Sequence, residues 1–266
     1  MVERDKNGTV FEVSGPEGAP VVALVHGLGL NRQTWRAHAP ELAKRYRVLN
    51  YDLYGHGESA APPETPTLAL FAQQLRDLLD HLQIGACAVV GFSLGGMINR
   101  RFALDFPGRA TALAILNSPH ERGEEAQRAV EERAAKSAAG GPGATLDTTL
   151  KRWITAEFLR RETDTIEEIK RWVLANDPEI YAQCRWVLAN GVIEIIRPEP
   201  PITLPTLVMT CENDSGSTPA MSHAIASEIA GAQTIIVPHL QHLGLLERPE
   251  LFTQPVLQFL DQVKFH

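Results

Sequence analysis

Cysteine is scarce in this chain: three occur among its 266 residues, as Cys87, Cys184 and Cys211. Because the number is odd and the spacings are wide, the sequence predicts neither a disulfide framework nor a zinc site of the CxxC kind. Unpaired thiols are typical of a reducing compartment, so we predict a cytoplasmic protein that binds no metal.

Long apolar runs and an excess of basic residues are missing as well. No apolar stretch approaches the ~20 residues that span a bilayer, and the charged residues 1–7 do not resemble a secretory signal. The 25 Lys and Arg residues face 32 Asp and Glu residues, a net charge of -7. We therefore expect a small-molecule substrate as the partner, and neither a nucleic acid nor a membrane. A homodimer is compatible with the sequence, which leaves the oligomeric state open.

Short apolar segments do occur, and they alternate with helical patterns. Strands are predicted at residues 8–14, 21–25, 47–51, 87–90, 112–116, 206–210 and 234–237. Helices are predicted at residues 34–44, 67–83, 94–105, 219–230 and 249–263. Several of these strands are apolar on both faces, which is typical of strands buried in a parallel sheet. The alternation predicts an α/β fold with a mostly parallel sheet flanked by helices.

The region between the fifth and sixth of these strands interrupts the alternation. It begins charged and rich in alanine, and then shows helical spacing with three of the four tryptophans. Arg-Trp-Val-Leu-Ala-Asn occurs at 171–176 and again at 185–190, and Asp177-Pro178 between the copies predicts the start of a helix. The predicted division is an α/β core of residues 1–119 and 202–266 and an inserted helical cap of residues 120–201.

Gly91-Phe92-Ser93-Leu94-Gly95 matches the pattern G-x-S-x-G. The pattern needs a sharp turn between a strand and a helix, which presents the serine oxygen above the sheet. A buried strand precedes this segment and a helix follows it, so the context fits. We predict that Ser93 is a catalytic nucleophile; the alternative is a glycine-rich turn with an incidental serine.

A serine nucleophile requires a base, and in hydrolases of this kind the acid and then the histidine follow later in the chain. Asp214 follows the strand at 206–210, and His242 follows the strand at 234–237. We predict Asp214 as the acid that orients the base and His242 as the base. Glu212 and His239 are the rival candidates for these two roles.

Acyl transfer also needs donors for the developing oxyanion. The backbone amides of Leu94, directly after the nucleophile, and of Leu28, in the loop of residues 26–29, are the predicted donors. Gly27-Leu28-Gly29 could instead begin a dinucleotide-binding loop, but position 32 holds Arg32 where that pattern requires glycine. We therefore predict no dinucleotide at this loop. Residues 52–59, which include His56, are interpreted as a tight structural turn.

Several residues are candidates for substrate contacts. The candidates for an apolar pocket are Trp153, Trp172, Trp186, Leu188 and Ile195, with packing between cap helices as the alternative. The candidates for holding a substrate carboxylate are Arg32, Arg152 and Arg185.

Taken in order, these motifs make the chain resemble the α/β-hydrolase superfamily over nearly its whole length. The matching segments are His26-Gly27-Leu28-Gly29, Asp52-x-x-Gly55-His56-Gly57-x-Ser59, Gly91-x-Ser93-x-Gly95-Gly96, Asp214 with Thr218-Pro219, and His242 with Glu247-x-Pro249-Glu250. Within the superfamily the chain is most similar to the 3-oxoadipate enol-lactonase-like and carboxylesterase-like branch. This resemblance includes the segment Asn176-Asp177-Pro178-Glu179-x-Tyr181. The resemblance implies a helical cap over the active site and no cofactor.

The sequence thus predicts a serine hydrolase that cleaves an ester or enol-lactone bond in a small organic substrate through an acyl-enzyme. Cleavage of a C–C bond in a diketone, or cofactor-free perhydrolysis, could use the same three residues. A ligand receptor with slow turnover on a hydrolase scaffold is the alternative from another class.

Overall fold

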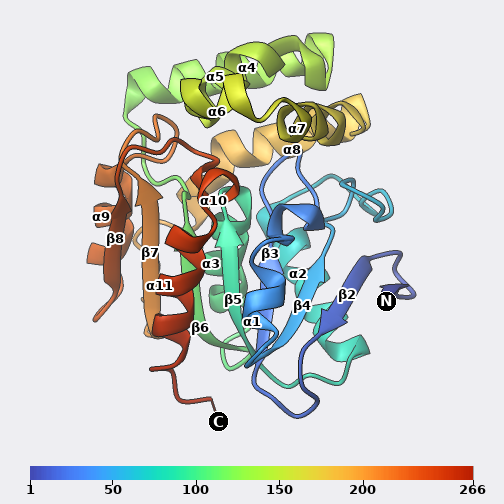
Figure 1. The fold of residues 1–266 in the computed structure, drawn as a ribbon, viewed down its shortest axis with the longest axis vertical. Helices are drawn as coiled ribbons and strands as arrows, with labels where there is room; N and C mark the ends of the chain where they lie inside the picture. The colour runs from blue at the N-terminus through green and yellow to red at the C-terminus, as the bar shows by residue number, and fades with distance from the viewer. Residues whose placement is uncertain (266) are drawn as a thin grey trace.

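An eight-stranded sheet runs through the centre of the molecule in the computed structural model, which describes residues 1–265 (Figure 1). The strands are β1 (Val2–Arg4), β2 (Val10–Ser14), β3 (Val21–Val25), β4 (Arg47–Tyr51), β5 (Cys87–Phe92), β6 (Ala110–Leu116), β7 (Thr206–Cys211) and β8 (Gln233–Val237). Their order across the sheet is β1-β2-β4-β3-β5-β6-β7-β8. β1 and β2 pair antiparallel at one edge, and all pairs from β4 to β8 are parallel. The predicted fold class is confirmed.

Helices cover both faces of this sheet, and the burial of the strands follows from this. The core helices are α1 (Ala39–Leu42), α2 (Leu68–His81), α3 (Leu94–Asp105), α9 (Pro219–Ser227), α10 (Gly244–Glu247) and α11 (Glu250–Leu260). In Figure 1, α1 and α11 lie in front of the sheet, and α2 and α3 lie behind it. Every residue of β5 and β7 is buried, which explains why these strands are apolar on both faces.

The first predicted helix was wrong in its length. Residues 34–44 do not form one helix: a 3₁₀ turn at Arg32–Trp35 is followed by the short α1. Pro40 lies in the first turn of α1. A continuous helix would place its ring against the carbonyl of residue 36 and lose the hydrogen bond that a backbone N–H would donate there. The exposed strand β1 was not predicted, because its residues show no apolar pattern.

Helices α4 to α8 lie between β6 and β7 in the chain and across the carboxyl ends of the parallel strands in space, at the top of Figure 1. They are α4 (Glu124–Gly140), α5 (Leu146–Trp153), α6 (Ala156–Arg161), α7 (Thr163–Leu174) and α8 (Pro178–Asn190). The predicted helix start at Asp177-Pro178 is confirmed, since the Asp177 carboxylate accepts hydrogen bonds from the amides of Glu179 and Ile180. We refer to α4–α8 below as the cap.

Within residues 1–265, no helix combines the length and the apolar composition that a membrane crossing requires. The three cysteines are buried free thiols, and burial raises the pKa of each to about 12. A cytoplasmic location stays a prediction.

Candidate active site

Ser93 lies at the turn between β5 and α3 with φ of 56° and ψ of -112°, a backbone conformation that residues other than glycine rarely adopt. The surrounding glycines allow this turn because there is no space for a side chain. A Cβ atom at Gly91 would lie 2.1 Å from the carbonyl oxygen of Gly95, and one at Gly95 would lie 2.2 Å from that of Val25. The glycines of the motif are therefore required by the close packing of the turn against the sheet.

His242 and Asp214 come together with Ser93 although they lie far along the chain. His242 Nε2 lies 3.1 Å from Ser93 Oγ, and His242 Nδ1 lies 2.6 Å from Asp214 Oδ2. Because an ionised carboxylate can only accept hydrogen bonds, Nδ1 carries the proton, which leaves Nε2 free to accept one from the serine hydroxyl. The three predicted residues form one continuous hydrogen-bonded chain.

The Asp214 carboxylate has hydrogen-bond donors on both of its oxygens. Oδ1 accepts from the amides of Gly216 and Ser217, each at 2.9 Å, and Oδ2 accepts from Asn117 Nδ2 at 2.9 Å as well as from His242. Burial alone would raise the pKa of Asp214, but His242 and the bonds from Asn117 and Ser217 hold it below its usual value. The carboxylate therefore stays ionised. Sequence reasoning missed Asn117, whose one local signal is its place directly after β6.

The two rival candidates lie outside this arrangement. The side chain of Glu212 is 50% exposed and that of His239 is 89% exposed. Glu212 Oε2 accepts a hydrogen bond from the His239 amide at 2.9 Å, so the pair forms its own surface contact. Neither side chain lines the cavity above Ser93.

The two predicted oxyanion donors lie close to Ser93. Leu94 is the first residue of α3, and the loop that carries Leu28 approaches the turn so closely that a Cβ at Gly27 would lie 3.2 Å from Ser93 Cβ. Among residues 1–265, neither amide donates a hydrogen bond to another protein group. Both are thus available for a ligand oxygen.

His26 positions the loop that carries Leu28 through two hydrogen bonds. Its Nδ1 donates to the Gly27 carbonyl at 2.8 Å, and its Nε2 accepts from the Leu53 amide at 3.0 Å. These two bonds require a neutral imidazole, and burial lowers the pKa of His26 to about 4. The side chain therefore acts in positioning the loop.

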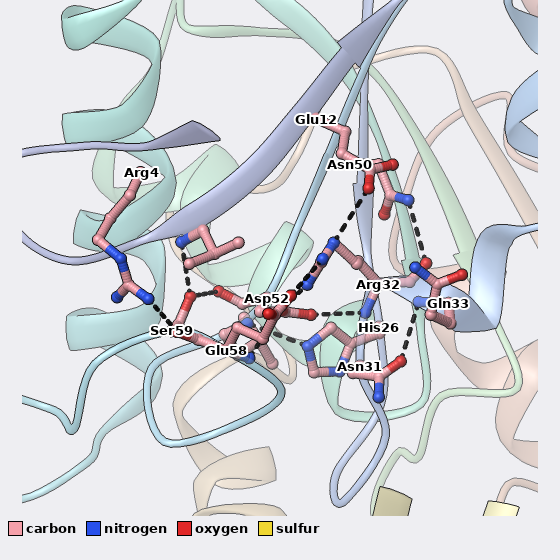
Figure 2. A network of polar contacts seen from close by, with 12 residues as sticks. Arg4, Glu12, His26, Asn31, Arg32, Gln33, Asn50, Asp52, Glu58 and Ser59 are labelled. Carbon is pink, nitrogen blue, oxygen red and sulfur yellow. Dashed lines mark hydrogen bonds and ion pairs between the residues drawn. The ribbon is translucent and has the colours of Figure 1, made fainter. Parts of the chain in front are cut away.

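A partly buried ionic network adjoins this loop (Figure 2). Asp52 accepts hydrogen bonds from the amides of Arg32 and Glu58 at 2.7 and 3.0 Å, and Ser59 Oγ donates to the Asp52 carbonyl at 2.7 Å. The predicted tight turn at 52–59 is confirmed. The guanidinium of Arg32 pairs with Asp52, Glu58 and Glu12. Arg32, one of the candidates for holding a substrate carboxylate, thus forms three ion pairs inside the protein and does not line the cavity above Ser93.

A cavity lies between the cap and Ser93. Its lining residues are Gly27, Leu28, Leu30, Phe92, Ser93, Pro119, Arg122, Val130, Arg133, Arg152, Trp153, Arg185, Leu188, Asp214, Gly216, Ser217, His242 and Leu243. Of the predicted apolar candidates, Trp153 and Leu188 line it. Trp172 instead packs against Arg36, Trp186 is 42% exposed, and Ile195 is buried in the core away from the cavity. Helical spacing shows which residues share a face, but not what covers that face.

The cap is hydrogen-bonded to two loops of the site. The Leu243 amide, next to His242, donates to the Trp153 carbonyl at 2.7 Å. Asn176 Nδ2 donates to the Gly29 carbonyl at 3.2 Å, next to the Leu28 loop. Two cap segments therefore help to position His242 and the loop that carries Leu28.

The sheet, the turn at Ser93 and the helices over the strand ends define the class of protein: an α/β hydrolase. Comparison with known proteins agrees. The family described as "Alpha/beta hydrolase family" matches residues 22–254, so the chain belongs to this family and is an enzyme of the hydrolase class.

The chain is similar to hydrolases over nearly its full length. It is 26% identical over 262 residues to (E)-2-((N-methylformamido)methylene)succinate hydrolase of Acinetobacter baylyi, covering 98% of this chain and 97% of the relative. It is 27% identical over 247 residues to 3-oxoadipate enol-lactonase 2 of the same organism, covering 92% and 90%. The crystal structure of the enol-lactonase from Burkholderia xenovorans LB400 superposes with a TM-score of 0.88 at 31% identity, covering 96% and 98%. The predicted resemblance is confirmed.

Proposed function

We propose that this enzyme hydrolyses an ester or lactone bond of a small organic substrate, with Ser93 as nucleophile, His242 as base and Asp214 as the residue that orients the base. The observation that carries the proposal is the hydrogen-bonded chain of 2.6 and 3.1 Å that ends at Ser93 Oγ. Such a chain activates a hydroxyl that is otherwise a weak nucleophile.

In the first half of the reaction, His242 Nε2 removes the proton from Ser93 Oγ as the oxygen attacks the substrate carbonyl carbon. The C–O bond to the leaving alcohol then breaks, and His242 donates the proton to that oxygen. In a lactone the leaving oxygen stays attached to the acyl group. Asp214 remains a carboxylate throughout and stabilises the imidazolium that forms in between.

In the second half, His242 removes a proton from water, and the hydroxide attacks the acyl carbon. The bond to Ser93 Oγ breaks, Oγ regains a proton from His242, and the carboxylic acid leaves. The amides of Leu28 and Leu94 donate hydrogen bonds to the oxyanion in both halves. Removing one such donor typically lowers kcat about 100-fold or more.

The relatives support this class of reaction. One is named as a lactonase, another as a hydrolase of a substituted succinate, and the superposed structure is an enol-lactonase. Their identities of 26 to 31% support hydrolysis as the class of reaction, and we propose no particular substrate from them.

The test is hydrolysis of short-chain p-nitrophenyl esters and of an enol-lactone by the wild-type protein and by Ser93→Ala. We expect activity that disappears in Ser93→Ala and persists in Ser227→Ala, which removes an exposed hydroxyl. Full activity in Ser93→Ala would overturn the assignment of the nucleophile. A wild-type protein that cleaves neither substrate but cleaves a diketone would overturn the choice of bond, and a single turnover after stoichiometric labelling would favour a receptor.

A further inference from the structure

Four arginines line the cavity above Ser93, and they come from separate parts of the cap. Arg122 precedes α4, Arg133 lies in α4, Arg152 in α5 and Arg185 in α8. The acidic residue of the lining is Asp214, whose oxygens are occupied by His242, Asn117 and two backbone amides. The cavity therefore carries an excess of positive charge.

One of the four arginines has a role within the protein. Arg122 Nη2 donates to the Leu188 carbonyl at 3.0 Å, and its Nη1 donates to the Ala189 carbonyl at 3.1 Å. These carbonyls lie in the last turn of α8, where a cation is favourable because of the helix dipole. Arg122 thus holds the end of a cap helix.

The guanidinium groups of the other three arginines have few partners within the protein. Within the part of the chain that the structure describes, Arg133, Arg152 and Arg185 form no ion pair. Arg185 makes a hydrogen bond of 3.5 Å to Thr145 Oγ1 and is 7% exposed. We call these three residues the cap arginines.

The cap arginines repel one another. Burial and the charges of Arg133 and Arg185 lower the pKa of Arg152 to about 10, and burial and Arg185 lower the pKa of Arg133. Partly buried cations without a counter-ion destabilise a folded protein. An anion bound in the cavity would remove this repulsion.

We propose that the cap arginines bind a substrate that carries two carboxylate groups beside the bond that Ser93 attacks. A single carboxylate accepts a bidentate pair of hydrogen bonds from one guanidinium and neutralises one charge, which would leave two cations unpaired. Two carboxylates match the three cations better in both charge and acceptor number. The placement of the two carboxylates beside the attacked bond rests on the proposed function.

The position of Arg152 fits this role. It precedes Trp153, whose carbonyl accepts the Leu243 amide and whose ring lies 5.9 Å from the His242 ring. A Cβ at Gly216 would lie 3.9 Å from Arg152 Nη1, so the guanidinium lies beside the loop that carries Asp214. An anion held there would be positioned relative to the base.

The test is titration calorimetry of the wild-type protein with succinate, acetate and inorganic phosphate at low ionic strength. We expect succinate to bind at least about 10-fold more tightly than acetate, and binding to weaken at high salt. Equal affinity for succinate and acetate would overturn the proposal. Tighter binding of phosphate than of succinate would also overturn it, in favour of a phosphorylated substrate.

Variants distinguish a binding role from a structural one. R133M, R152M and R185M are each expected to weaken succinate binding at least about 10-fold, and to keep or raise the melting temperature because repulsion is relieved. R128M removes an exposed cation from the same helix as Arg133 and is expected to bind succinate normally. Variants that melt earlier but bind succinate like the wild type would overturn the proposal.

Inhibition of p-nitrophenyl acetate hydrolysis links the two proposals. We expect succinate to inhibit the wild type competitively and R152M at least about 10-fold more weakly, with each inhibition constant measured against that protein's own rate on the neutral ester. If the ester is cleaved and succinate neither binds nor inhibits, the cap arginines have been misassigned and the proposed function stands. If succinate binds but Ser93→Ala leaves cleavage unchanged, the proposed function fails and the anion site stands.

Discussion

The backbone amide of Leu243 donates a 2.7 Å hydrogen bond to the carbonyl of Trp153 and so joins the loop of His242 to the end of α5. A second link lies close by, where the Glu247 carboxylate accepts bonds from the amide and the hydroxyl of Thr155 at 2.9 and 2.6 Å. The cap is therefore hydrogen-bonded to the segment that carries His242. A disturbance of either link should affect both stability and substrate binding.

Thr155→Val tests the second link. The variant keeps the shape of the side chain but leaves one oxygen of the partly buried Glu247 without its donor, so the free energy of unfolding should fall by about 1–3 kcal/mol. Urea denaturation measures this, and KM for an ester should rise in parallel. Thr163→Val, at an exposed position in α7, is the control. Equal losses in the two variants would mean that the bond to Glu247 contributes nothing specific.

Asp214→Asn tests the orientation of the base. An amide at this position can donate to His242 Nδ1 and stabilise the wrong tautomer, so kcat should fall on the order of 10⁴-fold with the fold intact. Glu212→Gln, two positions earlier and exposed, should change kcat less than about 2-fold because it does not contact His242. Steady-state kinetics with circular dichroism as a folding control would decide. A larger effect of Glu212→Gln would exchange the two roles.

Gly95→Ala tests whether the glycines of the motif are required for packing. The new Cβ would lie 2.2 Å from the Val25 carbonyl oxygen, in the middle of the sheet where little can move. We expect a loss of about 3 kcal/mol or more in the free energy of unfolding. Gly85→Ala adds the same methyl group where no atom lies within 4 Å and should change stability by less than about 0.5 kcal/mol. Similar denaturation midpoints for the two variants would contradict the steric explanation.

The buried histidines predict how stability depends on pH. Burial lowers the pKa of His26 and His38 to about 4 and that of His56 to about 3, against 6.5 for an unfolded histidine. Between these values the unfolded chain binds protons that the native protein does not. The stability is therefore complete above about pH 6.5 and is lost as the pH falls toward 4.

His38→Gln isolates one of these contributions away from the active site. At pH 5, protonation of one such histidine in the unfolded state lowers the free energy of unfolding by about 2 kcal/mol. The decline in stability from pH 7 to pH 5 should therefore be smaller by about this amount in His38→Gln. Chemical denaturation over a pH series measures it, with His223→Gln, at an exposed position, as the control. An unchanged decline in His38→Gln would show that His38 takes up its proton while folded.

Much of the fold and of the site could be predicted because the relevant signals are local. The alternation of apolar strands with helical spacing predicted the parallel sheet. The turn at Ser93 followed from the two glycines of the five-residue motif, where there is no space for a Cβ atom. The break between the 3₁₀ turn at Arg32–Trp35 and α1 depended on Pro40, also a local signal, and was missed.

Other residues could not be assigned from sequence. Arg32 and Arg152 are both arginines, but Arg32 forms ion pairs with Asp52 and Glu58, while Arg152 lines the cavity. Asn117 is one polar residue after a strand, and its role depends on Asp214, which lies 97 positions later. Such pairings are set by which segments the fold brings together.

The sequence by itself determined the class of fold and the turn at Ser93, because periodicity and glycine placement act through neighbouring residues. Only the tertiary structure showed that His242 and Asp214, and not His239 and Glu212, form a hydrogen-bonded chain with Ser93, because burial and hydrogen-bond distance depend on elements far apart in the chain. It also decided that Arg133, Arg152 and Arg185 converge on one cavity, since the positions of α4, α5 and α8 relative to the sheet come from packing that no local pattern encodes.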